Sequence, residues 1–194
     1  MRGEPIRQLN EGLIAYKDEV TADSLTSKRV EVAIVTFGPV TIACDFTTAA
    51  QFTPPSLPVT GDTPMGEAVI KAIDMIVERK KVYRTNGISF YRPWIFLITD
   101  GAPNQGDPWR DAASRVKEGE GKKAFSFFSV GVEGADFDTL SQLGTREPLR
   151  LKGLRFKDLF SWLSNSQQSV SMSRPGDAVP LADPTKGPKG WAEV

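Results

Sequence analysis

Short apolar runs alternate with helical patterns along this chain, and that alternation restricts its possible folds more than any other feature. The apolar runs lie at residues 30–37, 94–99 and 124–132, and each predicts a strand. Helices are predicted before, between and after them, because apolar residues recur there at steps of three and four. Strands that alternate with helices form a mostly parallel sheet. We therefore expect an α/β fold of the Rossmann-like, doubly wound kind, with helices on both faces.

A hairpin is predicted at one edge of this sheet. Gly38-Pro39 follows the first apolar run, and residues 40–46 then alternate between apolar and polar side chains. That alternation is typical of a half-exposed strand, whereas a continuous apolar run is typical of a buried one. We expect the run at 30–37 to be buried, the run at 94–99 to be covered on both faces, and residues 40–46 to form an antiparallel edge strand.

The length and composition suit a single medium-sized domain followed by a tail. The chain has 194 residues, of which 40% are hydrophobic and 25% are charged, close to the averages for globular proteins. We place the domain at residues 1–172. Residues 173–194 are rich in proline and glycine, and we expect them to be mobile or to lie on the domain surface. Whether Trp191 docks on the domain or on a partner is left open.

Several classes of function and site are disfavoured or excluded. Lys plus Arg and Asp plus Glu number 24 each, so the charge does not favour nucleic acid or a membrane as a partner. The chain has no histidine, which excludes His-based catalytic triads and His-containing zinc sites. Any metal is therefore a hard ion with oxygen ligands. The single cysteine, Cys44, cannot form an internal disulfide, which fits a cytoplasmic location.

Thr63 and Asp100 are the candidate ligands for such an ion. Asp100 directly follows the run at 94–99, and Thr63 lies in a loop that enters a helix. Ligands bind such sheets beyond the carboxyl ends of the strands, where a hydroxyl and a carboxylate can share a cation. Each residue also has a purely structural interpretation. Asp100 suits the following turn, and Thr63 suits a helix N-cap before Pro64.

Several longer motifs surround these two residues. They are "GEPI" at 3–6, "VTFG" at 35–38, "FTPP" at 52–55, "GDTPMGEA" at 61–68, "FLITDGAP" at 96–103 and "FFSVGVEGAD" at 127–136. In these motifs the chain resembles a von Willebrand factor A (VWA) domain, and it is similar to bacterial VWA proteins of the tellurite-resistance type. The likeness covers roughly residues 1–172. It implies a metal-ion-dependent adhesion site, in which Mg²⁺ or Mn²⁺ is held by an Asp-x-Ser-x-Ser loop, a threonine and an aspartate. Thr63 and Asp100 match the last two.

The first element of that site is absent from this sequence. In the family, the Asp-x-Ser-x-Ser loop ends a central strand just before the residues that here read 1–6. A hard divalent ion prefers about six oxygen ligands, so we expect binding by this chain to be weak or undetectable. A missing buried strand removes roughly 7–15 kcal/mol of apolar burial, comparable to the whole stability of a domain. We therefore expect a native start upstream of Met1, or another segment or chain in the vacant strand position.

The expected function is that of a metal-ion-dependent protein-binding module and not of an enzyme. The resemblance implies a regulatory or assembly role in stress or tellurite resistance, with an acidic side chain of the partner protein completing the metal site. One alternative is a metal-free scaffold subunit, and another is a Mg²⁺-dependent phosphatase-like enzyme. No glycine-rich phosphate loop supports the enzyme.

A basic cluster in the predicted second long helix has two interpretations. Arg79, Lys80, Lys81 and Arg84 either form a solvated helix end or contact a phosphate or an acidic partner.

Overall fold

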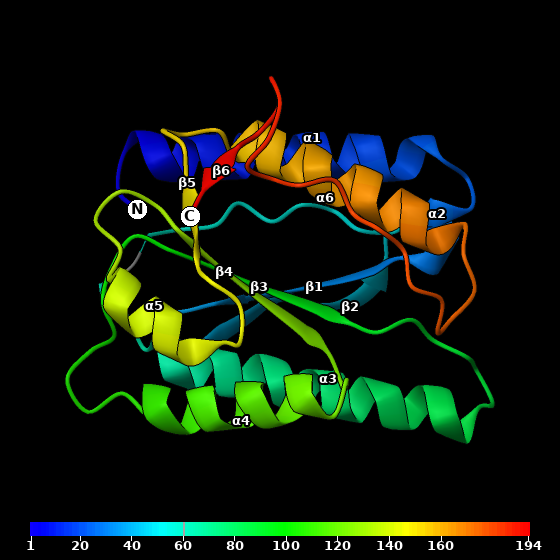
Figure 1. Cartoon of the computed structure of the whole chain (residues 1–194), viewed down its shortest axis with the longest axis horizontal. Helices are drawn as coiled ribbons and strands as arrows, with labels where there is room; N and C mark the ends of the chain where they lie inside the picture. The colour runs from blue at the N-terminus through cyan, green and yellow to red at the C-terminus, as the bar shows by residue number, and fades with distance from the viewer. Residues whose placement is uncertain (60) are drawn as a thin grey trace. The chain divides into compact units, whose positions relative to one another are not determined.

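The computed structural model describes residues 1–59 and 61–194, and it confirms the predicted α/β class (Figure 1). Its helices are α1 (Glu4–Ala22), α2 (Thr26–Arg29), α3 (Met65–Thr85), α4 (Trp109–Gly121), α5 (Phe137–Leu143) and α6 (Phe156–Ser171). Its strands are β1 (Glu31–Thr36), β2 (Thr41–Thr48), β3 (Trp94–Thr99), β4 (Ser126–Gly131), β5 (Leu149–Leu151) and β6 (Ala192–Glu193). None of the described helices is long and apolar enough to span a membrane.

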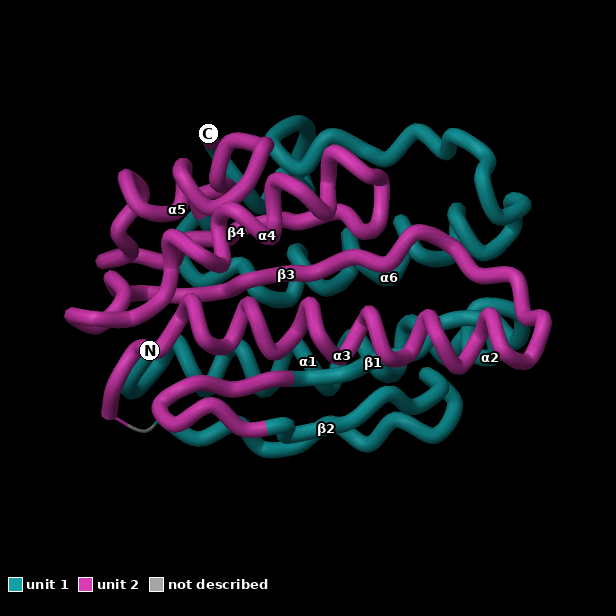
Figure 2. The backbone as a smooth tube through the Cα atoms, turned by 90° about the horizontal axis from the view of Figure 1, so that it is seen from below, with its two compact units in different colours: residues 1–34, 42–59, 151–193 teal, residues 35–41, 60–150, 194 magenta. Residues whose placement is uncertain are grey.

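The chain divides into two compact units, coloured separately in Figure 2. Unit 1 comprises residues 1–34, 42–59 and 151–193. Unit 2 comprises residues 35–41, 60–150 and 194. Both candidate metal ligands, Thr63 and Asp100, belong to unit 2.

The strands form two hydrogen-bonded ladders. One consists of β1 and β2, which a connection of four residues joins into the predicted hairpin. The other has the order β3-β4-β5-β6. In this ladder β3 pairs in parallel with β4, from Trp94 opposite Ser126 to Thr99 opposite Gly131, and β4 pairs in parallel with β5. The carboxyl ends of β3 and β4 therefore lie at one edge, as the ligand-binding prediction requires.

Unit 1 is built around the packing of α1 against α6 (Figure 1). The buried face of α1 carries most of the predicted apolar stripe: Leu9, Leu13, Tyr16 and Val20. Gly12 on the same face lets α6 approach, because a Cβ there would lie 2.7 Å from the ring of Phe160. The Tyr16 hydroxyl donates to Gln167 Oε1 at 2.7 Å. Burial raises the pKa of Tyr16, so this hydroxyl remains a donor even in alkaline solution.

Residues 173–194 fold back onto unit 1. The Trp191 side chain is fully buried and packs edge-on against Trp162, with ring centroids 5.8 Å apart. Lys152 N–H donates to the Trp191 carbonyl at 2.9 Å, and Arg155 donates to the carbonyl of Gly190 at 2.8 Å. The docking of Trp191, which the sequence left open, is therefore to this chain itself.

Unit 2 is built around α3, α4 and the β3–β4 pair. Helices α3 and α4 lie side by side (Figure 1), and α4 and α5 both contact β4. Two glycines allow these contacts: a Cβ on Gly119 would overlap the ring of Phe125, and a Cβ on Gly131 would overlap the ring of Phe137.

Two predictions of strand burial were wrong. The first apolar run was expected to be buried, but every residue of β1 is only half-buried. In β3, burial alternates: Ile95, Leu97 and Thr99 are buried, whereas the residues between them are half-buried. Each of these strands has a single strand neighbour in its ladder. Continuous apolar character therefore did not indicate equal coverage of both faces.

Candidate functional site

Three loops of unit 2 meet where β3 and β4 end. They are residues 61–64 before α3, residues 100–107 after β3 and residues 132–136 after β4. Val132 N–H donates to the Thr99 carbonyl at 2.8 Å, and Asp136 N–H approaches the Gly101 carbonyl at 3.4 Å. We call the described part of these three loops the rim.

Asn104 holds the Thr63 loop against the loop after β3. The Thr63 N–H donates to Asn104 Oδ1 at 2.8 Å, and the Asn104 N–H donates to the Thr63 carbonyl at 3.1 Å. These two bonds fix the backbone of Thr63 on both of its polar groups. They leave the orientation of its side chain to other contacts.

Asp107, and not Thr63, caps the start of α3. The Asp107 carboxylate accepts from Gly66 N–H at 2.7 Å and from Glu67 N–H at 3.3 Å. Helix N-termini have backbone N–H groups without partners within the helix, and a carboxylate that accepts from them stabilises the helix. Within the described part of the chain, no hydrogen bond involves Thr63 Oγ1. The capping interpretation of Thr63 was therefore wrong.

The Thr63 hydroxyl lies beside the backbone that follows Asp100. A Cβ placed on Gly101 would lie 3.6 Å from Thr63 Oγ1. Thr63, Asp100 and Gly101 are all half-buried. The structure thus brings the two candidate ligands to the same rim, with the hydroxyl next to the residue after the carboxylate.

Asp100 lies in a tightly built turn. Gly101 N–H donates to Thr99 Oγ1 at 3.3 Å, so the threonine that ends β3 supplies an acceptor within the turn. On its other side, Gly134 has a positive φ of 96°, and a Cβ there would lie 3.0 Å from the Asp100 carbonyl oxygen. A residue with a side chain at 134 would be strained and would press on the backbone of Asp100.

Asp136 is another acidic residue at the rim, but it serves the local structure. Its carboxylate accepts from Thr139 N–H at 3.1 Å and from the Thr139 hydroxyl at 2.6 Å, which caps α5. These hydrogen bonds lower the pKa of Asp136. Both of its oxygens are thus used within the helix start.

Neither protein families nor curated proteins identify this site. A scan against protein-family models and a search of curated proteins find no match to this chain.

The rim provides an incomplete set of ligands for a divalent cation. Thr63 and Asp100 offer one hydroxyl and one carboxylate, and both are the hard oxygen donors that Mg²⁺ prefers. Among the described residues, however, no three His, Cys, Asp or Glu side chains gather in a group that could hold a metal ion. The donor types fit Mg²⁺ or Mn²⁺, but their number does not, so further oxygen atoms are needed to hold the ion.

Two residues that organise the rim were not predicted from the sequence. Asn104 and Asp107 lie in the loop after β3, a segment without a periodic sequence pattern. Asn and Asp are common beside glycine and proline in turns, so their positions gave no sign of a further role. Their roles depend on an approach between segments about forty residues apart in the chain.

Proposed function

We propose that unit 2 is a protein-binding module that engages an acidic side chain of a partner protein at the rim. The observation that carries this proposal is the position of the Thr63 hydroxyl and its lack of a role in helix capping. This hydroxyl is released from helix capping by Asp107 and lies beside the turn that carries Asp100. A hydroxyl and a carboxylate at one edge can together hold a divalent cation that a partner's carboxylate then binds. Without a cation, the Asp100 carboxylate would repel an acidic partner.

A divalent cation would bridge the rim and the acidic side chain of the partner. When bound, Mg²⁺ or Mn²⁺ would offer an open position to a partner's carboxylate, with Thr63 and Asp100 as two of its ligands. Two protein ligands are few for such an ion, so we expect weak binding by this chain, with dissociation constants on the order of 10⁻³ M or larger. The partner's carboxylate supplies one more oxygen and so strengthens cation binding.

The resemblance to VWA proteins of the tellurite-resistance type supports the wider role. On that basis we propose a non-enzymatic regulatory or assembly function in a bacterial stress response. This part rests on the motifs at 61–68, 96–103 and 127–136 and on analogy within the family.

An NMR titration tests the proposal. A short peptide with one Glu side chain serves as the probe, with and without Mg²⁺. We expect shifts of the amide signals at residues 61–66 and 99–104, larger when both are present. The shifts should be lost in Thr63→Ala and Asp100→Ala. Asp111→Asn changes an acidic residue in the first turn of α4 and is the matched control. Unchanged shifts in the Thr63→Ala and Asp100→Ala variants would contradict the proposal.

A metal-free scaffold subunit is the second candidate. It is favoured because, among the described residues, no group of three His, Cys, Asp or Glu side chains that could hold a metal ion forms around Asp100. The same titration separates the two candidates. A scaffold gives no shift with Mg²⁺ or Mn²⁺ alone, and none that depends on the cation when the peptide is added.

A further inference from the structure

The far end of α3 carries cations that are not free in solvent. Lys80 Nζ donates to the carbonyl of Ala124 at 3.0 Å and lies 5.5 Å from the centroid of the Phe90 ring. Arg84 Cζ lies 5.7 Å from the same centroid. One aromatic ring therefore gathers two cations from successive turns of the helix, as cation–π attraction favours.

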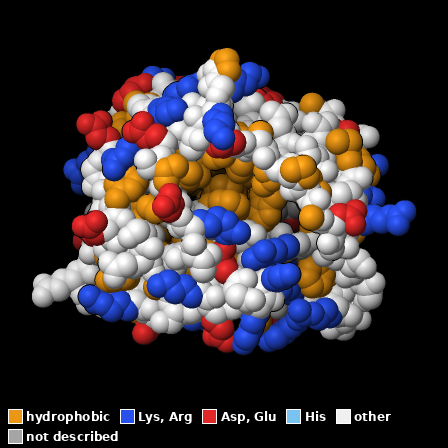
Figure 3. Space-filling view, in the orientation of Figure 1, with side chains coloured by type: hydrophobic (Ala, Val, Ile, Leu, Met, Phe, Trp, Pro, Cys, Tyr) orange, Lys and Arg blue, Asp and Glu red, His pale blue; other side chains and the backbone are white. Residues whose placement is uncertain are grey.

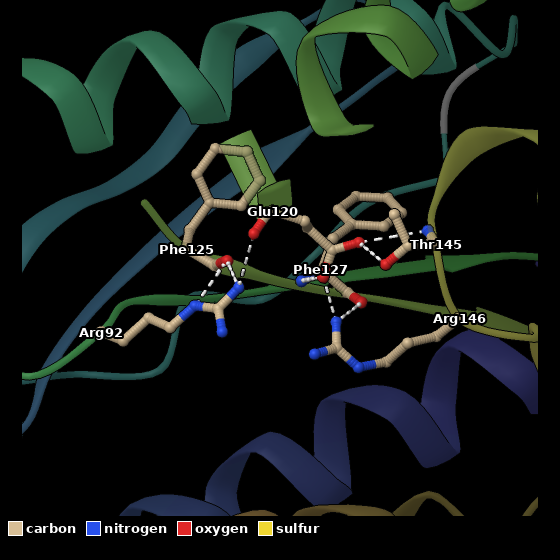
Figure 4. A network of polar contacts seen from close by, with 6 residues as sticks. All are labelled: Arg92, Glu120, Phe125, Phe127, Thr145 and Arg146. Carbon is tan, nitrogen blue, oxygen red and sulfur yellow. Dashed lines mark hydrogen bonds and ion pairs between the residues drawn. The ribbon is translucent and has the colours of Figure 1, made fainter. Parts of the chain in front are cut away.

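Arg92 adds a third cation from the segment before β3. Its Nε donates to the carbonyl of Phe125 at 2.8 Å, and its guanidinium also reaches the Glu120 carbonyl at 3.4 Å, as Figure 4 shows. Lys80 and Arg92 thus bind the carbonyls of two consecutive residues, 124 and 125. We call Lys80, Lys81, Arg84 and Arg92, with Phe90 among them, the basic face.

Among the described cations of the basic face, Lys81 already has a carboxylate partner, and two carboxylates of α4 pair with cations outside this face. Glu78 pairs with Lys81 at 2.6 Å, Glu118 pairs with Lys122 at 2.5 Å, and the buried Glu120 pairs with Arg146. In the part of the chain that the structure describes, no carboxylate forms an ion pair with Lys80, Arg84 or Arg92.

The electrostatics follow from this arrangement. Burial lowers the pKa of Lys80, and the charges of Arg84 and Arg92 lower it further. Like charges have therefore been brought together without neutralisation, which an incoming anion would relieve. The C-terminal dipole of α3 favours cations in its last turn, but it does not account for Arg92, which lies outside the helix.

Apolar side chains accompany the cations. Val77 is 43% exposed and Ile88 is 50% exposed. Val77 lies four residues before Lys81 and seven before Arg84, so the three share one face of the helix. Figure 3 shows Lys and Arg side chains along the lower edge of the molecule, where α3 and α4 lie, with other side chains between them.

The aromatic rings disfavour a nucleic acid as the ligand. Single-stranded nucleic acids bind by stacking bases on free aromatic faces. Phe90 already stacks with Tyr83, at a centroid distance of 5.5 Å, and contacts the cations of Lys80 and Arg84. Stacking a base on Phe90 would require these contacts to be displaced. Exposed aliphatic side chains instead suit a protein partner.

We propose that the basic face docks an acidic, amphipathic segment of a partner protein. Its carboxylates lie against Lys80, Arg84 and Arg92, and its apolar side chains cover Val77 and Ile88. This surface is separate from the rim, because Thr63 precedes α3 and Arg84 lies in its last turn. A helix of this length spans about 30 Å, and the two proposals therefore stand or fall independently.

Fluorescence anisotropy with a labelled helical peptide rich in Glu and Leu tests this proposal on the full chain. We expect saturable binding that weakens as salt is added. The double variant Lys80→Glu, Arg84→Glu should weaken binding by about tenfold or more. Lys117→Glu, on the exposed side of α4, changes charge in the same direction and should weaken binding by less than about twofold. Circular dichroism checks that each variant is folded.

A second set of measurements identifies the ligand class. Val77→Ser should weaken peptide binding by a factor of about three, because an apolar contact is lost, and should leave the binding of polyphosphate unchanged. The proposal is overturned if the double variant binds the peptide as well as the wild type does. It is also overturned if a single-stranded oligonucleotide or vesicles containing phosphatidylserine bind more tightly than the peptide.

Discussion

Gly66, in the first turn of α3, determines how closely this helix approaches α4. A Cβ at this position would overlap the backbone of Trp109, and backbone atoms cannot move aside as a flexible side chain can. The glycine is therefore required by packing and not by backbone conformation.

The Gly66→Ala substitution should destabilise the protein by about 1–3 kcal/mol, which is typical of overpacking. Urea denaturation followed by circular dichroism measures the change. Gly121→Ala is the matched control, because a Cβ there meets nothing within 4 Å. The control should be neutral or stabilising by up to about 1 kcal/mol. Equal effects at both positions would rule out the packing explanation.

Asp107 should contribute more to the stability of the protein than Thr63 does. Asp107→Ala removes the carboxylate that caps α3 and should cost about 0.5–2 kcal/mol of stability. Thr63→Ala removes a hydroxyl that takes no part in capping, and should cost less than about 0.5 kcal/mol. Thermal unfolding of the two variants measures both values. If Thr63→Ala were the more costly, its hydroxyl would have a structural role after all.

At the residue scale, the sequence predicted the pair at the rim but not the residues that support it. Thr63 and Asp100 were predicted because each adjoins an element with a strong periodic signal. Asn104 and Asp107 lie in an irregular loop, and their partners are the backbone groups of Thr63, Gly66 and Glu67. Hydrogen bonds to a distant backbone leave no mark on local sequence patterns.

At the scale of elements, Glu120 joins the end of α4 to β4 and to the loop before β5 (Figure 4). Its side chain is 3% exposed and pairs with Arg146. It also accepts from the N–H of Phe127 at 3.0 Å and from the hydroxyl of Thr145 at 2.6 Å. Burial opposes the charge of Glu120, but these bonds and Arg146 outweigh it and lower its pKa below the ordinary 4.5.

The contribution of Glu120 to the free energy of unfolding should decrease as the pH falls. Because the folded pKa is the lower one, the stabilisation is present above pH 4.5 and is lost as the pH falls through the folded pKa. Glu120→Ala should cost about 1–3 kcal/mol near neutral pH, because it leaves the buried N–H of Phe127 without its acceptor, whereas the exposed Arg146 can turn to water. The cost should shrink in acid. Urea denaturation at about pH 7 and about pH 3 tests this, and a cost that is the same at both would contradict it.

The longer elements followed from periodicity, and the two shortest, α2 and β6, did not. The stripes of α1, α3 and α6 extend over several turns, so their apolar residues repeat often enough to be recognised. Helix α2 has four residues and β6 has two, which is too few for a period to appear. The predicted burial of β1 and β3 was wrong because the burial of a strand depends on strand neighbours that lie far away in the chain.

At the scale of the whole chain, residues 173–193 are part of a folded unit and not an appendage to it. Trp191 is fully buried, and its indole N–H has no hydrogen-bond partner among the described residues. The burial of a large aromatic surface therefore has to exceed the cost of an unsatisfied donor.

Trp191→Ala should destabilise unit 1 by about 3–5 kcal/mol, as is usual for the loss of a buried aromatic side chain. Val194→Ala, at a residue that is 71% exposed, is the control and should change stability by less than about 0.5 kcal/mol. Urea denaturation monitored by far-ultraviolet circular dichroism gives both values. A Trp191→Ala variant as stable as the wild type would mean that the tail is dispensable for folding.

The edge-on pair of Trp162 and Trp191, 5.8 Å apart, also gives the molecule an intrinsic optical reporter. Two indoles this close couple their electronic transitions, and the coupling vanishes once they separate. Release of the carboxyl-terminal segment can therefore be followed in real time, without an attached dye, from the loss of the coupled dichroism band of this pair.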